Sequence, residues 1–166
     1  MLYRHRVVRE GVIAGVIGAT AVVVWFLILN GLTGRPLLFT PLVLGRALFG
    51  VLGPIGSENP LVHAAAYTAF HYAAFILLGV LLSLFVHRAE EQPSVLALFL
   101  IIFVVFEMAF YGLTAILSDN AVLGSIAWWE IGAANLLAAL LMGAYMWRLH
   151  PALGSEFAHA LGDYRE

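Results

Sequence analysis

Histidine, tyrosine and glutamate side chains recur at helical spacing inside two strongly apolar parts of the chain. His63, Tyr67 and His71 follow one another at intervals of four residues, and Glu107 and Tyr111 are separated by the same interval. In an α-helix this spacing places the side chains on one face. Imidazole nitrogens and carboxylate oxygens bind transition metals, and phenol groups exchange hydrogen bonds. The two stripes therefore predict a polar site within apolar surroundings.

Four apolar runs are each long enough to cross the hydrocarbon core of a bilayer, which is ~30 Å thick and takes ~20 helical residues. The 166-residue chain is 63% hydrophobic and only 11% charged, which excludes a soluble enzyme. We predict an all-α fold, an integral membrane four-helix bundle that forms one membrane domain over residues 1–166. The expected spans are residues 11–30, 61–86, 94–117 and about 124–147.

The connection between the first two spans is long and has a pattern of its own. Residues 31–60 hold four of the six prolines and six glycines. Thr40 and Pro41 are typical of a helix start, with threonine as the N-cap and proline as the first helical residue. The apolar segment that follows, about residues 41–52, is too short to span a bilayer. We expect a short interfacial or re-entrant helix there, in the outer loop.

The eight basic residues, all of them arginine, are distributed unevenly among the connections. Arg35 and Arg46 lie between the first two spans. The other six belong to the termini and to the connection between spans two and three: Arg4, Arg6, Arg9, Arg88, Arg148 and Arg165. Cytoplasmic connections carry the excess of positive charge in membrane proteins. We therefore expect both termini in the cytoplasm, and a multi-pass protein of the cell inner (plasma) membrane.

Equal depth in the bilayer brings polar residues of neighbouring spans together. His71 and Glu107 each lie about 11 residues from the outer ends of their spans. Tyr67, Tyr111 and Glu130 each lie about seven residues from those ends. Because consecutive spans run antiparallel with short connections, residues at one depth can face each other. The sequence thus predicts two polar layers in the outer half of the bundle.

A single metal ion is the ligand that this set of side chains favours. We expect its ligands among the imidazole and carboxyl groups of His63, His71, Glu107 and Glu130. Iron, copper, zinc and manganese all suit these donors. Tyr67, Tyr111 and Asn135 are the expected contacts of a bound cofactor. Glu130 and Asn135 lie about 140° apart around a helix, so only one of them can face the site. No catalytic residue follows from the sequence, and whether the protein is an enzyme stays open.

The pattern disfavours a di-iron centre and haem, and it leaves a redox cofactor, a quinone or a proton relay as alternatives to a single metal ion. Di-iron bundles carry Glu-x-x-His on two helices, and neither Glu107 nor Glu130 is followed by such a histidine. Haem is less favoured, because the intramembrane histidines lie on one span, ~12 Å apart along its axis. The chain has no cysteine, which excludes disulfides and thiolate metal sites. A redox cofactor, a quinone site or a proton relay remains an alternative, since a buried carboxyl group beside a histidine can exchange protons.

The same residues could instead only hold the helices together. Interhelical hydrogen bonds in membranes average ~0.6 kcal/mol, whereas a charged side chain at the centre of a span costs ~2.5–3.5 kcal/mol. This imbalance favours a ligand. The alternative function is a non-catalytic accessory or scaffold subunit of a larger membrane complex. With a net charge of -2 and no basic block, nucleic acid is not an expected partner.

Small residues at four-residue spacing predict where helices approach closely. They are Gly11 and Gly15 on the first span, and Asn135, Ala139 and Gly143 on the last. Such faces serve packing within the bundle or within a homo-oligomer. The histidines that border the cytoplasmic segments are expected to be solvated, namely His5, His87, His150 and His159. Charged residues of the outer loop, Arg35, Arg46 and Glu58, are expected to pair with one another or with a partner.

Overall fold

The described part of the chain is almost entirely helical. A computed structural model describes residues 2–53, 59–89 and 128–151, together with the single residues 104, 108 and 126. Its helices are α1 (Leu2–Leu32), α2 (Phe39–Leu52), α3 (Pro60–Ala89) and α5 (Trp128–Leu149). These residues include no strand, so the prediction of an all-α protein is confirmed at this level.

Three of the helices are long and apolar enough to cross a membrane. They cover His5–Leu32, Pro60–Ala89 and Trp129–Leu149. The expected span at 94–117 lies outside the described residues, so the four-helix bundle and its orientation stay predictions. The outward faces of the long helices carry exposed leucines, including Leu77, Leu136 and Leu140. Such surfaces are consistent with a membrane protein, because lipid rather than water can surround them.

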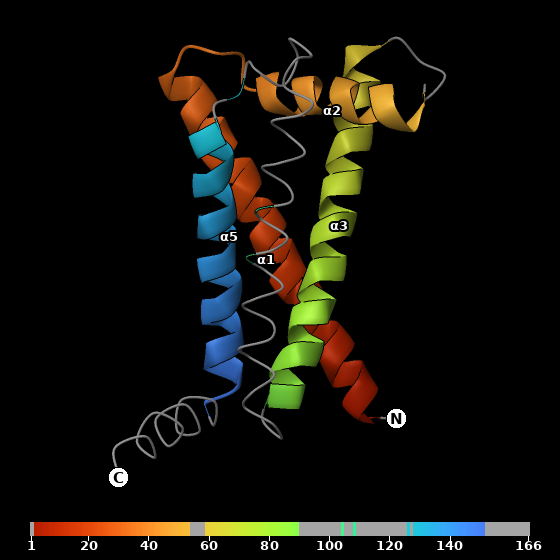
Figure 1. Ribbon diagram of the computed structural model, residues 1–166, viewed down its shortest axis with the longest axis vertical. Helices are drawn as coiled ribbons and strands as arrows, with labels where there is room; N and C mark the ends of the chain where they lie inside the picture. Colours follow the sequence, from red (N-terminus) through yellow and green to blue (C-terminus); the bar gives the residue numbers. More distant parts are fainter. Residues whose placement is uncertain are drawn as a thin grey trace.

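The long helices pack around α1, and α2 lies across one end of them (Figure 1). α1 crosses α3 and also packs along α5, whereas α3 and α5 touch little in the described residues. α2 packs mainly on the first turns of α3. At the opposite end of the molecule α1 begins, and α3 and α5 finish. We call these two ends the α2 end and the N-terminal end.

Glycines allow α1 and α3 to cross at backbone contact. A Cβ atom added at Gly79 of α3 would contact the Gly11 carbonyl and lie 2.9 Å from the Cα of Gly15. A Cβ at Gly11 would lie 2.8 Å from the Val80 nitrogen. Small residues four apart let helix backbones meet in this way in membranes. The crossing fixes the faces that α1 and α3 turn toward each other near the N-terminal end.

The contact between α1 and α5 is apolar along most of its length. Two buried clusters contribute to it, one with Ala14, Met142 and Met146, the other with Phe26 and Ala138. These residues of α5 lie beside the predicted small-residue face, not on it. Gly143 is exposed, and a Cβ there would meet nothing within 4 Å in the described part of the chain. In the described residues this face does not meet α1, and its packing within the bundle or within a homo-oligomer stays a prediction.

Polar side chains hold the turn between α1 and α2. The amide of Asn30, which is fully buried, donates to the Thr40 hydroxyl at 3.1 Å and to the Leu37 carbonyl at 3.3 Å. α2 begins at Phe39, with Leu38 in the N-cap position and no side-chain cap. The expected N-cap role of Thr40 was wrong, because its hydroxyl is engaged with Asn30. Pro41 falls in the first turn, where its missing N–H costs no hydrogen bond.

Candidate metal centre

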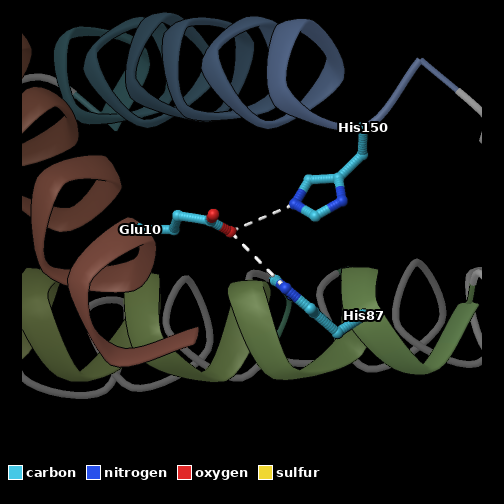
Figure 2. A group of neighbouring side chains, drawn as sticks. All are labelled: Glu10, His87 and His150. Atoms are coloured by element: carbon cyan, nitrogen blue, oxygen red, sulfur yellow. Dashed lines mark hydrogen bonds and ion pairs between the residues drawn. The ribbon is translucent and has the colours of Figure 1, made fainter. Parts of the chain in front are cut away.

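Three titratable side chains from three separate segments converge at the N-terminal end (Figure 2). Glu10 projects from α1, His87 from the last turn of α3, and His150 from the residue after α5. One Glu10 carboxylate oxygen, Oε2, lies 3.2 Å from His150 Nε2 and 3.6 Å from His87 Nε2. One donor atom from each residue lies within 4.8 Å of the others. We call this group the Glu10 cluster.

The Glu10 cluster is buried although it lies near the ends of its helices. Each of its three residues is only 6% exposed. The imidazole rings of His87 and His150 meet nearly edge to face, with centroids 4.6 Å apart and planes at 74°. The two rings thus approach the same carboxylate oxygen from different directions, as ligands around one ion do.

Helix packing places each member of the cluster. Glu10 directly precedes Gly11, so it enters the α1–α3 contact at the glycine crossing. His87 lies eight residues after Gly79, two turns along the α3 face that meets α1. His150 lies one turn after Met146, which is buried in the α1–α5 core, and its N–H continues the helix by donating to the Met146 carbonyl at 3.0 Å. The side chains therefore meet because α1 contacts both other helices.

A backbone hydrogen bond fixes the orientation of the His87 ring. Its Nδ1 lies 2.9 Å from the Ser83 carbonyl, which can only accept, so Nδ1 carries a proton. In the neutral ring Nε2 is then a lone-pair acceptor, and it faces the acceptor oxygen of Glu10. A proton or a metal ion shared by these two atoms would bind both of their lone pairs. Metal-ligating histidines commonly hold their second nitrogen to a carbonyl in this manner.

Glu10 Oε2 is hydrogen-bonded to His150 Nε2 at 3.2 Å, and the arginine paired with Glu10 in the described residues adds little compensation of its charge. Arg6 lies one turn earlier on α1, with its Nε 3.8 Å from Glu10 Oε1. The Arg6 side chain is 71% exposed, and ion pairs with such exposed partners contribute little. A buried carboxylate in an apolar assembly requires a closer positive charge. A cation bound among Glu10, His87 and His150 would supply this positive charge.

The predicted site residues on α3 lie elsewhere and contact neighbouring backbone. His71 is buried, and its Nε2 donates to the Ala19 carbonyl of α1 at 3.2 Å. Tyr67 stacks on the His71 ring with centroids 5.9 Å apart. His63 Nδ1 donates to the Asn59 carbonyl at 3.1 Å, and its ring meets that of Phe49 on α2 edge-on. In the described residues these side chains join helices and form no metal-ligand group.

Glu130 lies at the α2 end, in a contact of its own. It is buried in the first turn of α5, and its Oε2 accepts from Arg35 Nη1 at 3.0 Å. The Arg35 guanidinium also lies over the Phe39 ring, 5.4 Å from its centroid. The Glu130 carbonyl accepts from the Trp25 indole N–H at 3.0 Å. The partner of Arg35 is thus a span residue, where a loop residue or a separate partner was expected.

Of the remaining predicted site residues, the structure describes only Asn135. Glu107 and Tyr111 lie outside the described residues, so the pairing of His71 with Glu107 and the second polar layer stay predictions. Asn135 is half-buried on α5, five residues after Glu130. None of the seven predicted site residues belongs to the Glu10 cluster.

The Glu10 cluster was missed because its members resemble solvated flanks in the sequence. His87 and His150 were expected to be solvated, and this was wrong, since helix packing buries both. Glu10 follows three arginines and directly precedes the first apolar run, where charge is ordinary. One signal was present: Gly79, Ser83 and His87 form a stripe at four-residue spacing. Small residues on a helix face indicate close packing against another helix. Because His87 shares this face with Gly79 and Ser83, the stripe predicts that His87 is buried in the same contact.

No known protein family, no curated protein and no solved structure matches this chain.

Proposed function

We propose that this protein is a membrane-embedded binder of a divalent transition-metal ion, held by Glu10, His87 and His150. Two histidines and one carboxylate form the ligand set of open zinc centres and of mononuclear non-haem iron centres. A tetrahedral zinc ion with bonds of about 2.0–2.1 Å separates its ligand atoms by about 3.3–3.4 Å. The two distances from Glu10 Oε2, 3.2 and 3.6 Å, are close to that separation.

The orientation of His87 is the observation that carries the proposal. Its Nδ1–H donates to the Ser83 carbonyl, so Nε2 is the ring nitrogen that faces Glu10 and can bind a metal ion there. This is the protonation state a metal ligand needs. A bound proton shared between His87 and Glu10 is the competing interpretation, and it concerns other residues than the relay of His71 and Glu107 expected from the sequence. Metal titration distinguishes the two.

The arginine distribution places the metal on the cytoplasmic side in this proposal. Arg6, Arg9, Arg88 and Arg148 are all exposed, and each lies within four residues of a cluster member. By the positive-inside rule this end faces the cytoplasm. A metal ion there joins α1, α3 and α5. Assembly as a homo-oligomer or within a larger membrane complex is compatible with this role and remains part of the proposal.

The test is metal binding by the full chain purified in detergent. We expect one Zn²⁺ or Co²⁺ per chain by calorimetry and elemental analysis. His87→Gln should weaken binding at least tenfold, because one of three ligands is lost. His63→Gln is the matched control, since it removes a histidine from the same helix outside the cluster, and it should bind as the unmodified protein does. Equal affinity in His87→Gln and His63→Gln would overturn the proposal.

A further inference from the structure

One buried hydroxyl beside the Glu10 cluster has no hydrogen-bond partner among the described residues. The side chain of Ser83 is fully buried, and its Oγ contacts no donor or acceptor there. Hydroxyls within helices commonly bond to the carbonyl four residues earlier. Thr33 and Thr68 do this, with distances of 2.8 Å to the Leu29 and Ala64 carbonyls. Ser83 does not, so its hydroxyl remains available for a group that the described residues do not supply.

Ser83 lies one turn of α3 closer to the middle of the helix than His87, and His87 is one of the three proposed metal ligands. It is one turn before His87 and one turn after Gly79, and both of those residues meet α1. Its own carbonyl holds the His87 ring through Nδ1. The hydroxyl is thus on the α3 face that meets α1, one turn deeper in the assembly than the metal ligands.

We propose that the Ser83 hydroxyl holds a water molecule that occupies the fourth coordination position of the metal. This rests on the proposed function and specifies it. Three protein ligands leave one position of a tetrahedral ion open, as in catalytic zinc centres, where water fills it. Buried water is found where it satisfies polar groups that lack other partners. The metal and the Ser83 hydroxyl are two such partners. The centre is therefore of the open, ligand-exchanging type, and small anions can replace its water.

Cobalt absorption with azide as a probe tests this inference on the full chain. Co²⁺ in the centre should show visible bands that shift to saturation as azide replaces the water. This measurement on the unmodified protein needs no variant. If Co²⁺ binds but azide leaves its bands unchanged, the centre is closed and the inference is overturned. If no Co²⁺ binds at all, the proposed function has failed.

A matched pair of variants then assigns the role of the hydroxyl. In Ser83→Ala we expect altered cobalt bands before azide is added, and an azide dissociation constant changed at least about threefold, the scale of one lost hydrogen bond. Co²⁺ affinity should fall by about tenfold or less, since the ligands and the Ser83 carbonyl remain. Thr68→Ala, which removes a hydroxyl bonded within the same helix, should match the unmodified protein. Cobalt bands and azide binding that are identical in both variants would overturn the assignment.

Discussion

At the scale of single residues, the chemistry of the molecule depends on two buried carboxylates with different partners. Glu10 faces two imidazole nitrogens at the N-terminal end. Glu130 faces a guanidinium at the α2 end, in the first turn of α5, where the helix dipole also favours negative charge. Arginine neutralises a carboxylate by itself, whereas an imidazole does so only when it carries a second proton. A cation bound at the two imidazoles can therefore supply charge compensation to Glu10 that Glu130 already has.

Replacing Glu10 should have opposite effects on metal binding and on the stability of the metal-free protein. In Glu10→Gln we expect Zn²⁺ affinity to fall by more than about tenfold, because an amide is a poor ligand for this ion. Without metal, the variant should be more stable by about 1 kcal/mol or more, since a buried charge is removed. Calorimetry and thermal unfolding in detergent with a chelator measure the two effects. A metal-free variant less stable than the parent would show that Glu10 is neutralised within the protein.

Breaking the pair of Arg35 and Glu130 should cost stability without touching metal binding. Removing one partner of a buried pair typically costs ~3–5 kcal/mol. Arg35 is 28% exposed, so we expect a smaller loss of about 2–3 kcal/mol for Arg35→Ala. The double variant Arg35→Met with Glu130→Gln should recover most of it, because no unpaired charge remains. Equal losses in the single and double variants would mean that packing on Phe39, not charge, is responsible.

At the scale of helices, the glycine crossing of α1 and α3 positions the cluster. Glu10 directly precedes Gly11, and His87 follows Gly79 by two turns. Any change in the separation of these backbones changes the distance between the two ligands. Metal affinity should therefore respond to substitutions that contact no metal.

Gly79→Ala should weaken both folding and metal binding. Its methyl group would meet the α1 backbone at Gly11 and Gly15, which are not flexible side-chain ends, so the helices must separate. We expect a fall in unfolding temperature and a fall in Zn²⁺ affinity of at least about tenfold, as for other loss of ligand support. Gly143→Ala is the control, because a Cβ there meets nothing within 4 Å and alanine favours a helix. If Gly79→Ala leaves the metal affinity unchanged, the glycine crossing of α1 and α3 does not position the metal ligands.

The sequence predicted the elements better than it predicted the site. Hydropathy and length identified the long helices, since membrane insertion depends on composition over about 20 residues. The site depends on helix rotation, which periodicity alone does not determine when a helix is apolar on every face. His71 was correctly recognised as a buried polar residue, yet it turns toward the Ala19 carbonyl. His87 and Glu10 become buried only through the glycine crossing, and that pairing of α1 with α3 was not among the predictions.

At the scale of the whole molecule, the metal proposed here is a crosslink between three helices. It joins the N-terminal half of α1 to the last turn of α3 and to the residue after α5. A ligand that binds only the folded state adds stability in proportion to the logarithm of its concentration over its dissociation constant. The proposed centre is therefore a stability determinant for the whole assembly.

Adding or removing metal should shift unfolding of the full chain. At Zn²⁺ about 100-fold above its dissociation constant, the gain is about 2.7 kcal/mol. We expect a chelator to lower the unfolding temperature of the parent protein and to leave His150→Gln unchanged. Differential scanning fluorimetry in detergent measures both. A chelator effect of equal size in the parent and in His150→Gln would assign the stabilisation to a different site.

Polar contacts hold α5 to its neighbours at both of its ends. Near its start the Glu130 carbonyl and carboxylate engage Trp25 and Arg35, and just past its end His150 reaches Glu10. Contacts at both ends prevent α5 from sliding along α1 and from rotating about its own axis. If the contact with Glu10 is lost, the C-terminal end of α5 is still held by its apolar contact with α1, which includes Met142 and Met146. Glu130 and His150 are 20 residues apart, or roughly 30 Å of helix, so these two contacts hold nearly the full length of α5.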